Sequence, residues 1–166
     1  SDFRFHFGRS LNEKNIMKFT HFRRNLSLLM VVVVPAISAA DPVKMIDIGL
    51  IIEPTASHIS GYLEVLSARK GVRSVAVAAT DRATLEKAKR QLGKRFRGDG
   101  FLNAKEMLAK ARPALTIVTM EGVNAPVAIR LALEAGSHVL TEKPSCTKLE
   151  QFEQLMKKVS LVVGKY

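Results

Sequence analysis

The residues best suited to catalysis lie near the end of the chain. Glu142, Lys143 and Pro144 directly follow the short apolar segment 138–141. A lysine ammonium can donate to a substrate hydroxyl and favour the loss of its proton. The ordinary alternative is a Glu-Lys pair in a surface loop, because most exposed ion pairs contribute little. Lys143 is therefore the candidate catalytic residue.

Further polar residues follow other apolar segments, where they could contact a cofactor. Together with Glu142, the candidate cofactor-binding residues are Pro54, Thr55, Ser57, His58, Asp81, Arg82 and Asn124. Asp81 can accept hydrogen bonds from the ribose hydroxyls of an adenosine, or it can cap the helix that begins there, and the two roles are compatible. Arg82 can instead pair with a 2′-phosphate, so that NAD and NADP both remain open.

The candidates in the first loop have simpler alternatives. Ser57 can cap the following helix through its hydroxyl. His58 can contact a ligand, or it can be a half-buried histidine of that helix. Asn124 can form hydrogen bonds, but it cannot transfer a proton as a histidine would.

Apolar segments alternate with amphipathic ones along the chain, and this alternation predicts how the candidate residues are positioned. The expected strands are 44–52, 72–79, 114–120 and 138–141, and 161–163 is expected to begin a fifth. The expected helices are 58–68, 81–92, a short one capped by Asn103, 126–135 and 148–159. In the last helix, five residues are expected to face inward: Leu149, Phe152, Leu155, Met156 and Val159.

This order predicts a doubly wound α/β domain, a Rossmann-like parallel sheet with helices on both faces. The carboxyl ends of parallel strands meet at one edge, where such sheets bind ligands. We therefore expect the candidate residues at that edge. A dinucleotide site favours Gly-x-Gly-x-x-Gly after the first strand, because the pyrophosphate needs close approach to the backbone. The loop after Gly49 has no glycine, and Glu53 places a negative charge there.

The first forty residues predict an export signal. Residues 17–40 are basic, then apolar from Leu26 to Val34, then small, as in a secretory signal peptide. A buried strand or a short membrane anchor is the alternative, although the run is too short for a stable membrane span. Arg23 and Arg24 leave general secretion and twin-arginine export both open. Residues 1–16 are expected to be a non-native or misannotated extension, and residues 41–166 to form the domain.

Composition narrows the classes of partner. The 26 basic and 15 acidic residues give a net charge of +11, which by itself would suggest a nucleic-acid partner. The basic run from Lys87 to Arg97 has a single aromatic residue, Phe96, and lacks helix-turn-helix or zinc spacing. We therefore expect a solvated helix face and no nucleic acid. The lone Cys146 excludes an internal disulfide and any multi-cysteine metal site.

Residues 111–144 carry a resemblance to a known family. The segment Leu133–Pro144 (LEAGSHVLTEKP) resembles the end of the Rossmann domain in the glucose–fructose oxidoreductase/inositol dehydrogenase (Gfo/Idh/MocA) family. The resemblance covers about residues 43–166. It implies hydride transfer between NAD or NADP and a sugar or polyol, with Lys143 holding substrate or the nicotinamide ribose.

The same resemblance implies a second α+β domain, which in the family supplies the substrate-facing sheet and usually the acid/base histidine. The chain ends where that domain would begin, so this domain is expected to be absent and the chain to be truncated and inactive alone. The family's Thr-Pro-Asn-x-x-His is replaced by residues 119–124 (TMEGVN). Two functions remain: the cofactor-binding half of an oxidoreductase, or a non-catalytic domain of the same descent that binds a ligand or partner. A homo-oligomer is also open.

Overall fold

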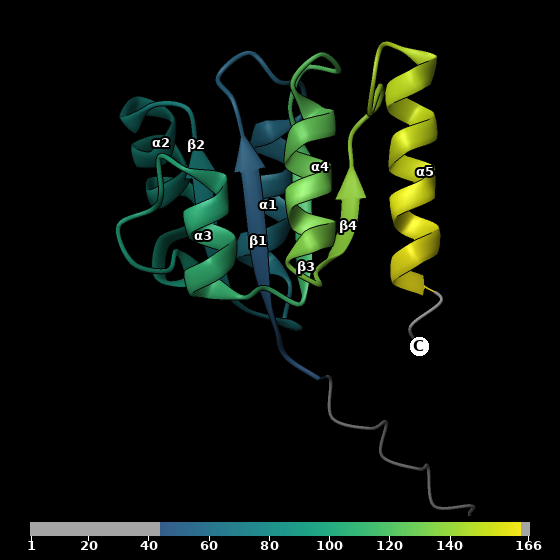
Figure 1. Cartoon of the computed structure of the whole chain (residues 1–166). Helices are drawn as coiled ribbons and strands as arrows, with labels where there is room; N and C mark the ends of the chain where they lie inside the picture. Colours follow the sequence, from purple (N-terminus) through teal and green to yellow (C-terminus); the bar gives the residue numbers. More distant parts are fainter. Residues whose placement is uncertain (1–43, 164–166) are drawn as a thin grey trace, which may run out of the picture. The chain divides into compact units, whose positions relative to one another are not determined.

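Residues 44–163 are described by the computed structural model of the chain. The extension expected at 1–16 and the signal peptide expected at 17–40 lie outside the described residues. The four strands are β1 (Ile46–Ile52), β2 (Val72–Ala79), β3 (Leu115–Thr119) and β4 (His138–Thr141). They form one parallel sheet in the order β2-β1-β3-β4, so the predicted fold class is confirmed (Figure 1).

The helices divide between the two faces of the sheet. They are α1 (Ile59–Ala68), α2 (Arg82–Leu92), α3 (Ala104–Ala111), α4 (Ala125–Glu134) and α5 (Leu149–Val163), with a short 3₁₀ turn over Gly93–Arg95. The helices α1 and α2 cover one face, and α3 and α4 cover the other (Figure 1). The chain therefore leaves β1 toward one face and β3 toward the other. Because β1 and β3 are neighbours, the topological switch point lies between them.

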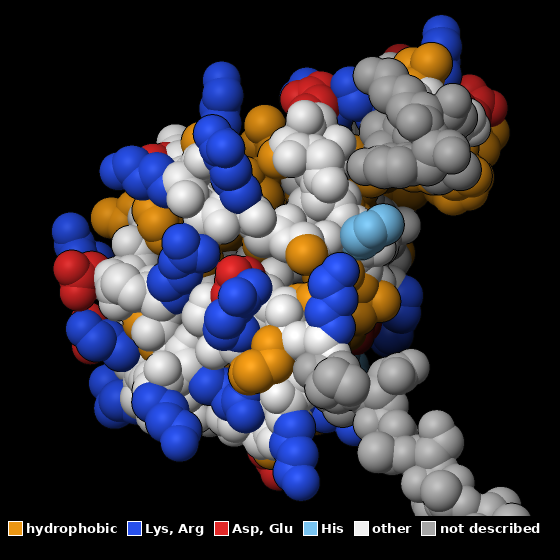
Figure 2. Space-filling view, turned by 90° about the horizontal axis from the view of Figure 1, so that it is seen from below, with side chains coloured by type: hydrophobic (Ala, Val, Ile, Leu, Met, Phe, Trp, Pro, Cys, Tyr) orange, Lys and Arg blue, Asp and Glu red, His pale blue; other side chains and the backbone are white. Residues whose placement is uncertain are grey.

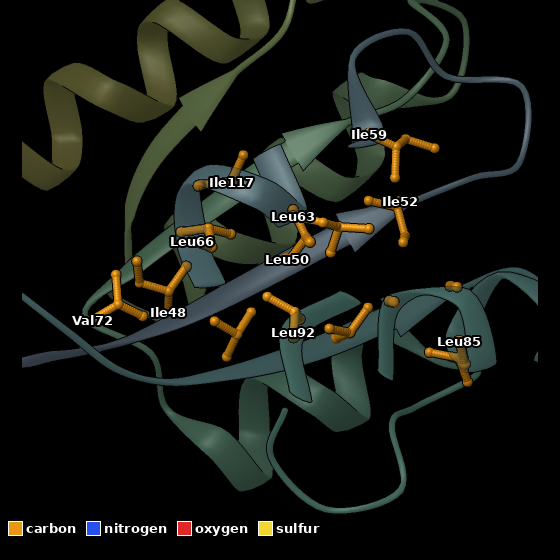
Figure 3. Close-up of a cluster of buried hydrophobic side chains, with 14 residues drawn as sticks. Ile48, Leu50, Ile52, Ile59, Leu63, Leu66, Val72, Leu85, Leu92 and Ile117 are labelled. Carbon is orange, nitrogen blue, oxygen red and sulfur yellow. The ribbon is translucent and has the colours of Figure 1, made fainter. Parts of the chain in front are cut away.

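Two apolar cores hold these layers together. One joins α1 and α2 to the sheet, and Leu50, Leu63 and Val77 in it are fully buried (Figure 3). The other joins α3 and α4 to the opposite face around Met107 and Val118. Burying a side chain of this kind stabilises the fold by about 2 kcal/mol. Strand β1 contributes Ile48, Leu50 and Ile52 to the first core and Ile51 to the second. Both of its faces are covered, which explains its nearly continuous apolar sequence.

The sequence predicts most element boundaries to within two residues. Asp81 and Asn103 cap α2 and α3 as expected, and each accepts a hydrogen bond from the backbone N–H three residues later. Both residues have extended backbone angles and a short side chain with an oxygen acceptor, which are the requirements for an N-cap. The segment after α2 adds parallel bridges from Phe96 and Phe101 to β2, so that it extends the sheet at that edge.

The predicted end of the chain is wrong in two respects. Residues 161–163 do not begin a strand, because α5 continues without interruption to Val163. The sequence of this helix contains no glycine or proline that could end it earlier. Of the five residues expected to face inward on this helix, only Leu155 is buried and Val159 half-buried, whereas Leu149, Phe152 and Met156 are exposed. The apolar stripe of α5 is therefore wider than the surface of α4 against which this helix packs.

Positive charge gathers at the edge formed by the amino ends of the strands. Lys and Arg side chains spread across this edge in Figure 2, and Arg69, Lys70 and Arg73 are exposed beside the start of β2. Two arginines of the predicted basic run bind backbone instead of lying free: Arg95 donates to the carbonyl of Val72, and Arg97 donates to that of Ala111 at 3.2 Å. Among the described helices, none is long and apolar enough to cross a membrane.

Candidate functional site at the carboxyl edge of the sheet

The candidate residues lie in the loops that leave the carboxyl ends of the strands. These loops lie at one edge of the sheet, at the top of Figure 1, because the four strands are parallel. The structure does not bring all the candidates into one cluster. It places them in three groups: Asp81 with Pro54, Asn124 with Glu53, and Glu142 with Tyr62.

An apolar cavity of about 160 Å³ opens between the ends of β1 and β2 and the helices α3 and α4. Thr80 and Asn124 contribute its polar atoms. Its other lining residues are mostly aliphatic, among them Ile51, Ala78, Leu102, Met120, Val127 and Leu131. A cavity lined by apolar side chains with a few polar groups is typical of sites that bind small organic ligands.

Asp81 lies beside a second cavity of about 270 Å³, which it lines together with Pro54 and Lys87. Its Oδ1 accepts from the backbone N–H of Thr84 at 2.8 Å, and its Oδ2 accepts from the Thr84 hydroxyl at 2.8 Å. These hydrogen bonds, the backbone one first, lower the pKa of Asp81 below its ordinary value. Each carboxylate oxygen has a second lone pair, so a ribose hydroxyl can still donate to Asp81.

The start of α1 differs from both sequence expectations. Ser57 does not cap the helix: the N-cap is His58, in the left-handed region (φ 67°, ψ 6°), and no side chain caps the turn. His58 is exposed and not half-buried. The N–H of Tyr62 donates to the carbonyl of His58, so the three N–H groups before it have no intrahelical acceptor. Because the first turn of α1 contains no acidic residue, the amino end of this helix can attract an anion.

Lys143 is exposed at the end of β4, and the turn before it is tied to α1. The hydroxyl of Tyr62 donates to Oε1 of Glu142 at 2.9 Å, and the backbone N–H of Lys143 donates to Oε2 at 3.2 Å. These two hydrogen bonds, the one from Tyr62 first, lower the pKa of Glu142. The sequence indicated no functional role for Tyr62. Its half-buried position, which only the structure shows, explains why its hydroxyl takes an acceptor.

The Tyr62–Glu142 hydrogen bond can be tested by titration. Burial first, and then the bond to the Glu142 carboxylate, raise the pKa of Tyr62 above its ordinary value. We expect Glu142→Gln to lower the pKa of Tyr62, since it removes the negative charge while burial remains. Ultraviolet absorbance of tyrosinate measures this cleanly, because the chain has no Trp and Tyr166→Phe leaves Tyr62 as the single tyrosine. Glu121→Gln is the control and should leave the pKa unchanged; an equal pKa in the Glu142 variant would disprove the contact.

Glu53 has a position that the sequence does not reveal. It follows β1 directly and is only 6% exposed. Its carboxylate accepts from the backbone N–H of Glu121 and, at 2.9 Å, from Nδ2 of Asn124. The side chain therefore joins the loop after β1 to the loop after β3. A carboxylate at the end of a buried strand hints at an internal partner, but only the fold identifies it.

The remaining candidates are simpler. Thr55 and Arg82 are exposed. Ser57 contributes its carbonyl, which accepts from the Thr119 hydroxyl at 2.9 Å. In the part of the chain that the structure describes, no group of three His, Cys, Asp or Glu side chains is placed to hold a metal ion.

The described residues fit the adenosine of a nicotinamide dinucleotide better than its pyrophosphate. The apolar cavity suits an adenine ring and Asp81 can accept from its ribose, since both are uncharged groups. The amino end of α1 offers N–H donors to a phosphate. Glu53 opposes the pyrophosphate, because its buried carboxylate has the same sign of charge.

The family relationship is clear at the level of sequence. Residues 38–160 match the Gfo/Idh/MocA family model, described as an oxidoreductase family with an NAD-binding Rossmann fold. No curated protein matches the chain.

Solved structures share the fold. A scyllo-inositol dehydrogenase from Lactobacillus casei, solved with NAD(H) and scyllo-inositol, is 21% identical with a TM-score of 0.64, over 73% of this chain and 34% of its own. A 3-ketoreductase from Actinomadura kijaniata, solved with NADP, is 24% identical with a TM-score of 0.60, over 70% and 36%. A myo-inositol 2-dehydrogenase from Lactobacillus plantarum is 22% identical with a TM-score of 0.58, over 70% and 33%.

The chain thus spans about a third of the length of these structures. The match to the family model nevertheless covers most of the chain, including all four strands and the predicted Glu142-Lys143-Pro144 turn. This match confirms the family that the sequence resembles. The chain belongs to the Gfo/Idh/MocA oxidoreductase family, of which it contains the NAD-binding Rossmann fold.

Proposed function

We propose that this chain is the cofactor-binding part of a nicotinamide-dependent oxidoreductase that acts on a sugar or polyol. The observation that carries the proposal is the family match over residues 38–160, whose loops meet at one edge of the sheet. The dehydrogenase and ketoreductase structures with the same fold support the substrate class. The cofactor, when bound, would supply or accept the hydride.

The residues of this chain would hold and orient the reactants. The aliphatic cavity would take the adenine, and Asp81 would accept from the adenosine ribose hydroxyls. The exposed Lys143 would donate to a substrate hydroxyl or to the nicotinamide ribose. Tyr62 would keep the Lys143 turn in place through Glu142. Asp81 favours NAD because its charge repels a 2′-phosphate, whereas the exposed Arg82 favours NADP.

The substrate side of the site would come from a further α+β domain, since the matched structures are about three times as long as the part they share with this chain. The second candidate function is that of a non-catalytic ligand- or partner-binding domain of the same descent. The buried Glu53 favours it, together with the absence of glycine from the loop after β1.

Cofactor binding can be tested on the full chain by titration with NADH and NADPH, following nucleotide fluorescence and thermal stability. A dinucleotide present at a hundred times its Kd should stabilise the chain by about 2.7 kcal/mol. No change at millimolar concentrations of either cofactor would exclude binding by this chain and leave the second candidate function.

The role of Asp81 can be tested in the same titration. We expect Asp81→Asn to weaken NADH binding about tenfold, because an amide is a poorer acceptor than a carboxylate. Asparagine is an equally good N-cap, so the fold should be kept. Glu86→Gln, on the exposed face of α2, removes the same charge away from the edge and should leave the Kd unchanged. Equal NADH affinity in the Asp81 variant and the parent would contradict the ribose contact.

A further inference from the structure

The carboxylate of Glu53 spans the crevice where the chain leaves β1 and β3 toward opposite faces of the sheet. Open α/β sheets bind their ligands in this crevice. Here the crevice is crossed by two hydrogen bonds from one side chain, to the N–H of Glu121 and to Nδ2 of Asn124. Both donors belong to the loop after β3, and Glu53 to the loop after β1.

A buried charge of this kind is stable only when donors compensate it. Glu53 is 6% exposed, and its two partners are an N–H and an amide next to the first turn of α4. A phosphate also binds at the positive end of a helix dipole and to free N–H groups. Glu53 therefore uses, from within the chain, the type of donor that a ligand phosphate would use.

The loops around Glu53 carry more negative than positive charges, so their net charge has the same sign as the Glu53 carboxylate. The four loops at the carboxyl edge contain four carboxylates, those of Glu53, Asp81, Glu121 and Glu142, and two lysines, Lys143 and Lys148, while Arg82 begins α2 next to Asp81. The net positive charge of the chain lies elsewhere, much of it at the opposite edge of the sheet (Figure 2). Lys87 of α2 lines the cavity next to Asp81.

We propose that Glu53 acts as an internal anion in this crevice. Its charge determines whether the crevice binds charged or uncharged ligands. Its carboxylate places a negative charge in the crevice, so that the crevice accepts an uncharged nucleoside readily and a pyrophosphate poorly. Removing the charge converts the crevice into a better dinucleotide site. This inference rests on the proposed function, because it takes the carboxyl edge as the site that binds the nucleotide.

The test compares adenosine, ADP and NADH binding to the full chain by calorimetry, in the parent and in Glu53→Gln. We expect Glu53→Gln to bind ADP and NADH at least tenfold more tightly, because like charges a few ångströms apart repel strongly in a partly desolvated crevice. The affinity for adenosine should change less than twofold. The Asn124 amide can turn to pair with the new amide, so the joint between the loops is kept.

Matched variants separate charge from shape. Glu121→Gln removes an exposed carboxylate from the same edge, keeps the backbone N–H that Glu53 uses, and should change NADH affinity less than threefold. Glu53→Ser removes the charge with a smaller side chain, and the gain should persist if charge is its cause. A thermal melt of each variant shows whether it is folded.

The outcomes distinguish the two claims. Equal NADH affinity in the parent and in both folded Glu53 variants overturns the internal-anion role and leaves the proposed cofactor binding intact. An equal gain for adenosine also overturns it, because the cause would then be space and not charge. Failure of every variant to bind any of the three ligands overturns both the internal-anion role and cofactor binding. A gain confined to ADP and NADH supports the inference.

Discussion

We expect Leu50→Ala to lower the free energy of unfolding by about 4 kcal/mol. Leu50 is fully buried in β1, in the cluster that joins the sheet to α1 and α2 (Figure 3). Hydrogen-bonded neighbours on both sides, β2 and β3, hold the backbone of β1 in place. The cavity left by the lost methyl groups therefore cannot collapse, and the cost falls in the upper part of the range for such substitutions.

Chemical denaturation, followed by far-ultraviolet circular dichroism, measures this loss. Leu149→Ala deletes the same atoms at the start of α5, where the side chain is 72% exposed, and should change the free energy by less than about 0.5 kcal/mol. Similar losses at the two positions would show that β1 is not the centre of the core. Because domains of this size are stable by only about 5–15 kcal/mol, the Leu50 variant should also melt at a clearly lower temperature.

The second large effect is expected from Gly49→Val, at about 3 kcal/mol of destabilisation. A Cβ at Gly49 would lie 2.9 Å from Cγ of Pro113 and 3.1 Å from Oγ1 of Thr116. The Thr116 hydroxyl is itself buried in a 2.8 Å hydrogen bond with Ser137, so it cannot move without breaking that contact. The glycine is therefore required by close packing between neighbouring strands and not by a turn.

Gly61→Val provides the matched control. Gly61 lies in α1, and a Cβ built there would meet no atom within 4 Å apart from the neighbouring backbone of its own helix. Valine is not a worse helix former than glycine. We expect this variant to stay within about 0.5 kcal/mol of the parent in the same denaturation experiment. If Gly49→Val were equally mild, the tight contact with Pro113 and Thr116 would be wrong.

Local patterns were sufficient to predict most of the fold. The boundaries of β2 and β4 were predicted without error, because each is a short apolar run between clear breakers. The caps Asp81 and Asn103 were predicted from side-chain chemistry and position alone. The sequence failed at α5, where an apolar run of helical spacing was taken as a buried face and its last three residues as a strand. How many apolar residues a helix can bury depends on the neighbour it packs against.

The candidate site was predicted less completely. The sequence indicated which residues lie at the carboxyl edge, because the order of strands and helices determines that edge. It did not indicate that Tyr62 reaches Glu142, 80 positions away, or that Glu53 reaches Asn124, 71 positions away. It also offered Ser57 as a possible cap, whereas His58 is the N-cap and no side chain caps the first turn of α1.

By itself, the sequence determined the family, the parallel α/β fold and the set of residues at the ligand edge, because periodicity, turn residues and the Glu-Lys-Pro block are local properties of the chain. Only the tertiary structure decided which of these residues meet. It placed Glu53 across the switch point and Tyr62 beneath the Lys143 turn, because these contacts depend on the register of β1 against β3 and on where α1 lies against the sheet. Such long-range distances have no signature in the local spacing of residues.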